Sequence, residues 1–363
     1  SIVEITKSCQ EVVFKGIDVN CVPSLLRNFS APVKISYPYS ISQLAHLMKH
    51  DSDGFNRWDA GQKLVTKILL SQVDNHTNGK LLKVDEELIE GYRELVLDPS
   101  IDDAVLALML QLPAEAALRE ASEPADPIAI HNSREFVRQA IASELERALG
   151  DLYLRCKQVE SYTPHKSQIG RRSLKNAALS YLMLTDSGID LAKGQFEEAD
   201  NMTDVAAALG ALVNCPEAKD YAERALKQFE DRWNDEALAM NLWFSIQARN
   251  PQQGGLERVK SLLAHPLFSM KNPNKVRCVL GTFCNDNLVN FHQPRGEGYE
   301  FLATKVLELN AINPQIGARL IIPLTRWRRY ASPHDSLMLD ALKRVGADSG
   351  LSKDIQEIVS KSL

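Results

Sequence analysis

The sequence predicts a mainly α-helical fold: an α-solenoid-like (HEAT/ARM-like) curved array of helix pairs, preceded by a few β-strands that belong to a β-sandwich domain. Two observations predict this class. Short β-branched and aromatic runs are confined to residues 1–40, and apolar residues recur at a helical period from Ser40 to the C-terminus. Helices that follow one another over more than 300 residues, with no strand between them, are typical of solenoids. The predicted domains are therefore residues 1–40 and residues 41–363.

The first domain is predicted from three short runs. Residues 3–5, 12–14 and 33–37 are rich in Val, Ile, Phe and Tyr, and turn residues and prolines separate them. Three short strands are too few for an independent domain. We therefore interpret them as the last strands of a β-sandwich whose remainder lies upstream of residue 1, so the chain looks like a fragment.

The second domain is predicted from apolar stripes at helical spacing. The first stripe follows Gly54 and contains Phe55, Trp58, Val65 and Ile68. The spacing between units is irregular and is compatible with roughly 35 to 45 residues, so a compact helical bundle is the competing architecture. The further stripes cover residues 88–97, 105–112, 136–149, 174–184, 205–213, 238–246, 259–263, 301–309 and 337–345.

Composition narrows the classes of partner. The chain has 363 residues, 44% of them hydrophobic and 25% charged, and a formal net charge of −5. These values are typical of a folded globular protein and give no general attraction to phosphate groups. No apolar run approaches the 18 or so residues of a spanning helix. We therefore expect neither nucleic acid nor membrane as a partner.

The six cysteines are spread too widely for a small disulfide framework. Cys278 and Cys284 are the only two close enough in sequence to suggest a metal or redox pair, and no CxxC motif is present. In a chain of this length such cysteines are typical of buried thiols in a reducing compartment. We expect the cytoplasm.

Motifs that carry chemistry are missing or incomplete. His46 and His50 are spaced as in a zinc-peptidase helix, but Leu47 stands where HExxH has its general-base glutamate. No GxSxG elbow, Walker-type loop or GxGxxG occurs. The sequence therefore predicts no catalytic residue and no metal ligand. The basic run of residues 326–330 (RWRRY) could bind an acidic partner, but such a run more often lies at a helix end, with its arginines paired or bonded to terminal carbonyls.

Two helices near the end of the chain begin with the same capping pattern. Asn272 and Asn313 can each cap a first turn, and a proline follows each of them at the first helical position. Each helix then carries an arginine within two turns, Arg277 and Arg319. Gln315 lies four residues before Arg319 and so shares its face. A guanidinium is well suited to bind carboxylates or peptide carbonyls, so we expect these side chains to form the wall of a binding site.

Six blocks along the chain carry a family resemblance. The blocks span residues 29–34 (FSAPVK), 55–60 (FNRWDA), 126–130 (DPIAI), 199–204 (ADNMTD), 272–277 (NPNKVR) and 313–315 (NPQ). In this order they resemble the C-terminal part of the aminopeptidase N family of zinc metallopeptidases, and in detail its bacterial and plant alanyl aminopeptidase branch. The resemblance runs from about residue 10 to the C-terminus and includes residues 351–363.

The resemblance implies a parent enzyme that removes N-terminal amino acids from peptides. Its zinc ligands and general base would belong to a catalytic domain upstream of this chain, which holds no cofactor itself and should be inactive alone. The helical domain would form a cavity wall that controls peptide entry and binds the peptide beyond the scissile bond. On the matching blocks, Arg277, Gln315 and Arg319 are the substrate-binding residues. The expected partners are the chain's own upstream catalytic domain and peptide substrates.

Alternatives remain open at this stage. Arg277 and Arg319 could pair with neighbouring acids, and Gln315 could complete a helix cap. The whole chain could be a freestanding solenoid scaffold for protein–protein interaction, or an independent enzyme of unknown type. The segments at residues 284–287 (CNDN) and 295–298 (RGEG) depart from the bacterial pattern, so substrate preference is not carried over.

Overall fold

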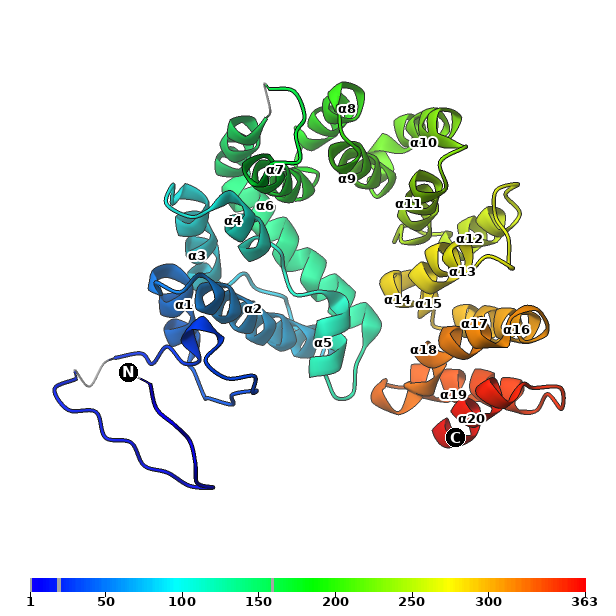
Figure 1. Cartoon of the computed structure of the whole chain (residues 1–363), viewed down its shortest axis with the longest axis horizontal. Coiled ribbons are helices and arrows are strands. Elements are labelled where there is room, and N and C mark those ends of the chain that lie inside the picture. Colours follow the sequence, from blue (N-terminus) through cyan, green and yellow to red (C-terminus); the bar gives the residue numbers. More distant parts are fainter. Residues whose placement is uncertain (1, 18–20, 158–159) are drawn as a thin grey trace.

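The computed structural model describes residues 2–17, 21–157 and 160–363. From Ile41 onward it is an array of helices that curves back toward itself (Figure 1). In that view the chain runs from α1–α6 on one side, over α7–α10, and down through α11–α20 on the other side. The predicted class, a curved solenoid-like array, is therefore confirmed for residues 41–363.

The first half of the array is built around one long helix, α6, which packs against α2, α3, α5 and α7. Its buried stripe includes Ile130, Val137, Ile141 and Leu145. The elements of this half are η1 (Arg27–Phe29), α1 (Ile41–His50), α2 (Gly54–Thr77), α3 (Glu86–Leu97), α4 (Asp103–Met109), α5 (Glu115–Ala121), α6 (Pro127–Cys156), α7 (Lys166–Leu182), α8 (Gly188–Glu198), α9 (Met202–Val213), η2 (Pro216–Ala218) and α10 (Lys219–Trp233).

The second half consists of shorter helices that pack on their neighbours in chain order. A turn of π-helix, η3, continues α13 without a break. The elements of this half are α11 (Ala237–Ala248), α12 (Gly255–Leu263), α13 (Pro273–Val276), η3 (Arg277–Gly281), α14 (Thr282–Asp286), α15 (Leu288–Phe291), α16 (Glu297–Ile312), α17 (Pro314–Leu320), α18 (Ile322–Thr325), η4 (Trp327–Arg329), α19 (His334–Gly346) and α20 (Lys353–Ser362).

Local sequence signals account for most helix ends. The side chains of Asp53, Asp102 and Asp126 accept hydrogen bonds from first-turn amides of α2, α4 and α6. Each apolar stripe expected from the sequence lies in a helix, but two stripes run past the helix end. The stripe at residues 174–184 passes the end of α7 at Leu182. The stripe at residues 105–112 stops being helical at Met109. Pro113 explains the early end, since a proline disfavours helical conformation in the residue before it.

The expected strands in residues 1–40 are not formed in the part of this segment that the structure describes, residues 2–17 and 21–40. The structure of this chain alone therefore does not show the expected strands. Residues 18–20 lie outside the described residues. The apolar side chains of the three expected strands are exposed, and Ile5 and Val13 are 72% and 70% exposed. The physical reason is that a strand is stabilised by its neighbours in a sheet, and this segment has no partner strand here.

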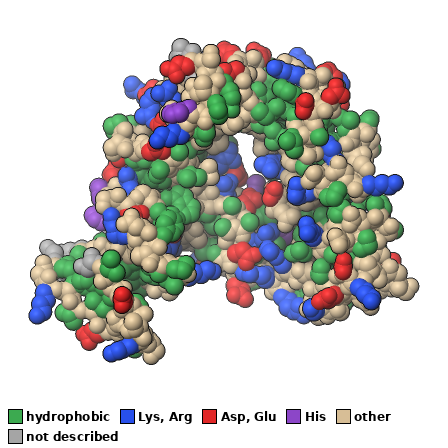
Figure 2. Space-filling view, viewed as in Figure 1, with side chains coloured by type: hydrophobic (Ala, Val, Ile, Leu, Met, Phe, Trp, Pro, Cys, Tyr) green, Lys and Arg blue, Asp and Glu red, His purple; other side chains and the backbone are tan. Residues whose placement is uncertain are grey.

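The two halves of the helical array meet between segments that lie more than 150 residues apart in sequence. Helix α15 packs on α6, and α14 packs on α5. The side chains of Leu288 and Phe291, on α15, are 2% and 0% exposed. The array is thus closed into a ring, and the ring surrounds a central hollow (Figure 2).

Candidate functional site

The hollow of the ring is a cavity of about 1160 Å³. Its lining comes from both halves of the array, chiefly from α6, α7 and α9 on one side and from α14 and α15 on the other. Figure 2 shows the hollow with basic, acidic and histidine side chains gathered around it. The curvature of the array therefore brings together residues that are far apart in the sequence.

One wall of the cavity is a polar face of α6. His131, Arg134, Glu135 and Arg138 line the cavity and lie three or four residues apart, so they share one side of the helix. The Glu135 carboxylate accepts from Arg138 Nη1 at 2.6 Å and from Arg134 Nη1 at 3.2 Å. His131 Nδ1 lies 2.7 Å from Glu115 Oε1 of α5. The wall thus presents both charge signs in fixed positions.

The opposite wall carries a second, looser pair. Asp286 Oδ2 lies 3.8 Å from Arg249 Nη2, and both residues line the cavity. Burial raises the pKa of the Asp286 carboxyl, and the nearby Arg249 guanidinium opposes this change. Both cavity walls can therefore bind polar groups of a ligand, and this polar lining was not predicted from the sequence.

The first predicted site residue, Arg277, lies where α13 passes into the π-helical turn η3. Asn272 caps this helix, as expected, by accepting from the amides of Asn274 at 2.9 Å and Lys275 at 3.4 Å. Arg277 is exposed, and its Nη2 donates to Asn274 Oδ1 at 2.8 Å. Its side chain is therefore held near the start of the helix by an amide and not by a carboxylate.

The other two predicted residues lie on α17. Asn313 caps this helix by accepting from the Ile316 amide at 3.3 Å, so the cap does not involve Gln315. Gln315 and Arg319 are both exposed. Within the described ranges, no hydrogen bond or ion pair joins either side chain to another residue. Both groups are therefore available to a ligand.

These three residues do not line the central cavity. Helix α17 packs chiefly on α16 and α20, whereas α13 and η3 pack chiefly on α11. The structure therefore brings Gln315 and Arg319 together on one helix face. It does not join Arg277 to them.

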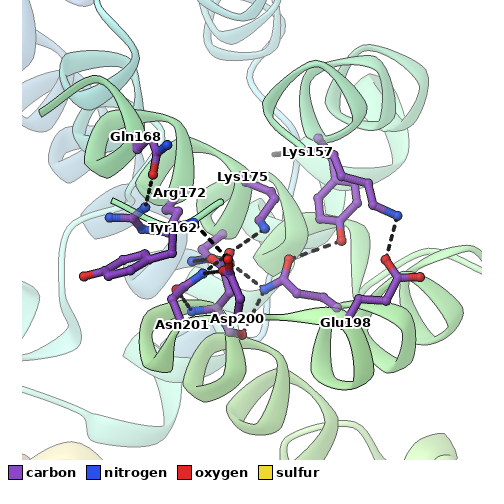
Figure 3. A network of polar contacts seen from close by, with 12 residues as sticks. Lys157, Tyr162, Gln168, Arg172, Lys175, Glu198, Asp200 and Asn201 are labelled. Atoms are coloured by element: carbon purple, nitrogen blue, oxygen red, sulfur yellow. Dashed lines mark hydrogen bonds and ion pairs between the residues drawn. The ribbon is translucent and has the colours of Figure 1, made fainter. Parts of the chain in front are cut away.

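The block at residues 199–204 forms a buried polar network (Figure 3). Lys175 Nζ donates to Asp204 Oδ2 at 2.6 Å, and these side chains are 7% and 3% exposed. Asn201 Oδ1 accepts from the Asp204 amide and caps α9, while Asp200 accepts from the Tyr162 amide at 3.0 Å. Gln195 Nε2, on α8, also donates to the Asp204 backbone oxygen at 3.0 Å, so the network joins α7, α8 and α9.

The histidine pair predicted to be incomplete as a metal site is exposed on α1. The rings of His46 and His50 lie with their centroids 5.0 Å apart. Among the residues that the structure describes, no three His, Cys, Asp or Glu side chains are grouped so as to hold a metal ion. These donors therefore do not fit a zinc site.

The basic run of residues 326–330 is engaged with the rest of the chain. Arg326 and Arg329 both pair with Glu120, and Arg328 donates to the backbone oxygens of Ser362 and Leu363. Trp327 Nε1 donates to Ser362 O at 3.0 Å. The expectation of paired arginines and bonded terminal carbonyls is confirmed, but the partner Glu120, some 200 residues away, was not predicted.

Comparison with known proteins identifies the family. Residues 41–363 match a family model described as "Domain of unknown function (DUF3458_C) ARM repeats", and residues 1–38 match one described as "Domain of unknown function (DUF3458) Ig-like fold". The whole chain is 37% identical to Aminopeptidase N of Escherichia coli over 365 residues and 34% identical to Aminopeptidase N of Haemophilus influenzae over 362 residues. The chain belongs to the aminopeptidase N family.

A solved structure extends this likeness to the fold. The crystal structure of Legionella pneumophila aminopeptidase A in complex with aspartic acid superposes with a TM-score of 0.83 and 32% identity, over 94% of this chain and 40% of that chain. The chain spans 42% and 41% of the length of the Escherichia coli and Haemophilus influenzae relatives. It is the C-terminal region of an aminopeptidase N-like enzyme, and the family resemblance seen in the sequence is confirmed. No helix among the described residues is both long and apolar enough to cross a membrane.

Proposed function

We propose that this chain forms the cavity wall of a zinc aminopeptidase that removes N-terminal amino acids from peptides. In this proposal the helical array controls which peptides enter and binds the peptide beyond the scissile bond. One observation carries the binding role: Gln315 and Arg319 share an exposed face of the capped helix α17 and have no partner in the described residues. Surface arginines without a binding role commonly pair with nearby acids, as Arg344 does with Glu300.

The chemistry of these groups fits peptide binding. A guanidinium presents planar donors that match a carboxylate or two peptide carbonyls, and an amide can both donate and accept. Such contacts hold the substrate in one orientation, and they contribute binding, not bond breaking. Arg277, placed on η3, would extend this polar surface if the rest of the enzyme covers both helices.

The catalytic zinc is proposed to lie in the catalytic domain of the parent enzyme. The chain contains no HExxH sequence, and its described donors do not fit a metal. We therefore propose that the chain is inactive alone, with its upstream catalytic domain and peptide substrates as its partners. The cavity of about 1160 Å³ is large enough for several residues of a peptide, which supports an access role.

We also propose a cytoplasmic location. All six cysteines are unpaired, and Cys156, Cys215 and Cys284 are buried. Burial raises the pKa of each of these three thiols, so they are protonated and unreactive at neutral pH. Thiols of this kind are common in proteins of reducing compartments.

The binding role predicts a selective effect of Arg319→Ala in the full-length enzyme. We expect kcat/KM for a peptide of three or more residues to fall roughly tenfold to 100-fold, which corresponds to the loss of one charge-assisted hydrogen bond. Hydrolysis of a chromogenic aminoacyl amide, which has no residue beyond the scissile bond, should change less than about threefold. Steady-state kinetics on both substrates measure the difference.

The control is Arg93→Ala, which removes a surface arginine that pairs with Glu90 on α3. It should leave both activities within about twofold of the parent. If Arg319→Ala lowers kcat/KM equally for the peptide and the amide, the proposed role of α17 is wrong.

A further inference from the structure

The ring is closed by a contact between two short segments that lie more than 200 residues apart. Ala125 N donates to Arg329 O at 2.7 Å, and Ala331 N donates to Ala125 O at 2.9 Å. These bonds make a parallel β-bridge between Ala125 and Tyr330. Residues 119–125 comprise the end of α5 and the segment after it in the first half of the array, and residues 326–331 surround η4 in the second half.

One carboxylate holds the two segments together by charge. Glu120 Oε1 lies 3.0 Å from Arg326 Nη1, and Glu120 Oε2 lies 2.6 Å from Arg329 Nη1. Arg329 Nη2 also donates to the Glu120 backbone oxygen at 2.8 Å. The three side chains are between 41% and 47% exposed, so water and salt reach them. Without Glu120 the two guanidinium groups would face each other uncompensated.

The layer beneath this bridge is polar and incompletely bonded. Arg119 is 7% exposed, and its Nε has no hydrogen-bond partner among the described residues. His292 is fully buried, and its Nε2 also has no hydrogen-bond partner among them. The rings of His292 and Tyr330 lie 4.9 Å apart. Burial raises the pKa of Tyr330, and the Arg119 guanidinium beside it opposes this change. Buried groups that lack a partner are costly, so opening the contact to water would relieve part of that cost.

The closed state is therefore held by opposing contributions. The apolar contact of α15 with α6 and the Glu120 ion pairs favour closure, whereas the unbonded atoms of Arg119 and His292 favour opening. Such a balance is typical of elements that move between two arrangements. We propose that residues 119–125 and 326–331 form a releasable latch that switches the helical array between a closed ring and an open arc.

The latch itself depends only on the geometry of this chain, whereas its consequence rests on the proposed function. In the closed ring the contact between α5 and η4 blocks entry to the cavity from that side. In the open arc a ligand can also enter from the side, between α5 and η4. The latch would thus regulate which peptides reach the cavity wall, with long or bulky peptides admitted when it is released.

Hydrogen exchange of the latch amides tests this proposal in the 363-residue chain. The amides of Ala125 and Ala331 are protected by the bridge, so they report its opening. Glu120→Gln should speed their exchange by roughly threefold to tenfold, which corresponds to the loss of two exposed ion pairs. Glu120→Arg places three cations together and should give a larger increase, with a larger radius of gyration in solution scattering. Amides in the middle of α10 should not change.

A matched control separates the latch from the loss of any surface ion pair. Arg344 and Glu300 form a pair of similar exposure, 45% and 53%, but both belong to the second half of the array. Glu300→Gln should leave exchange at Ala125 and Ala331 unchanged. The double variant Glu120→Arg with Arg329→Glu should restore protection in part.

Unchanged exchange at Ala125 and Ala331 in both Glu120 variants would overturn the latch, and so would equal acceleration of the α10 amides, which would mean global unfolding. Glu120→Gln keeps the size of the side chain, so it remains informative if Glu120→Arg does not fold. Because exchange is measured without any peptide turnover, a failed latch is distinguishable from a failed binding role of Arg319.

Discussion

At the scale of single residues, the buried cluster of His292, Tyr299 and His334 links the stability of the chain to pH. The Tyr299 hydroxyl lies 2.7 Å from His292 Nδ1 and 2.9 Å from His334 Nδ1. Burial lowers the pKa of His292 well below 6.5, and the nearby His334 and Arg119 add to this shift. Burial also lowers the pKa of His334, although Asp126 and Asp335 oppose it. Both rings are therefore neutral in the folded chain.

These shifts predict that the chain loses stability in acid. The unfolded chain binds protons at its histidines near pH 6.5, whereas the folded chain does not bind them at His292 or His334 until the pH is lower. The stabilisation is complete above about pH 6.5 and is lost as the pH falls below that value. The free energy of unfolding should decrease by up to about 1.4 kcal/mol per pH unit for each histidine. Urea unfolding between pH 7.5 and pH 5 measures this slope.

The slope should become smaller in His292→Gln, because one of the two titrating groups is gone. His46→Gln, at an exposed position, should keep the slope of the parent chain. If His292→Gln unfolds with the same pH dependence as the parent, the cluster is not the source of the acid sensitivity.

The roles of single residues could be predicted from the sequence where they depend on neighbours only a few residues away. The caps formed by Asn272 and Asn313 were predictable, because a capping side chain bonds an amide only two or three residues away. The charged wall of α6 was not predicted, although its residues 131, 134, 135 and 138 are spaced along one face. Which face of a helix meets a cavity depends on the curvature of the whole array. The substrate-binding roles of Arg277, Gln315 and Arg319 stay a prediction.

At the scale of elements, a close backbone approach fixes the start of α16. A Cβ atom at Gly298 would lie 2.2 Å from the backbone oxygen of Phe291, which belongs to α15. Gly298→Ala should therefore lower the free energy of unfolding by about 3 kcal/mol, because one of the two helices must shift. Thermal or urea unfolding measures this change.

Gly150, within α6, gives the matched comparison, since a Cβ atom there would meet nothing within 4 Å. Gly150→Ala should raise the free energy of unfolding by about 0.5 to 1 kcal/mol through helix propensity alone. The two alanine substitutions should thus have opposite signs. A stabilising or neutral Gly298→Ala would contradict the tight contact between α15 and α16.

The elements themselves were largely predictable, because apolar residues at helical spacing lie within the helices that form. The apolar stripe of residues 136–149 lies within α6, and that of residues 301–309 lies within α16. The strands predicted in residues 1–40 are not formed in the described part of this chain for a physical reason. Residues 1–38 match an Ig-like family model, yet the described residues of this segment are unpaired. Sequence pattern indicates strand propensity, but the ladder also needs partner strands.

At the scale of the whole molecule, ring closure was the feature that the sequence did not predict. Glu120 and Arg329 are 209 residues apart, and nothing in the spacing of charges along the chain indicates that they meet. The curvature that brings them together is the sum of many small rotations between neighbouring helices. The same curvature forms the cavity, so the proposed access role and the latch both depend on it.

The central claim is that this array serves as the cavity-forming domain of a larger zinc aminopeptidase. The most direct test is the intact mass and zinc content of the native gene product, captured with an antibody raised against this chain. We expect a polypeptide more than twice the 40.5 kDa of this chain, because the chain spans only 42% of its Escherichia coli relative, and we expect one bound zinc ion per polypeptide. A zinc-free product of 40.5 kDa would contradict the claim and would point to a helical scaffold that works alone.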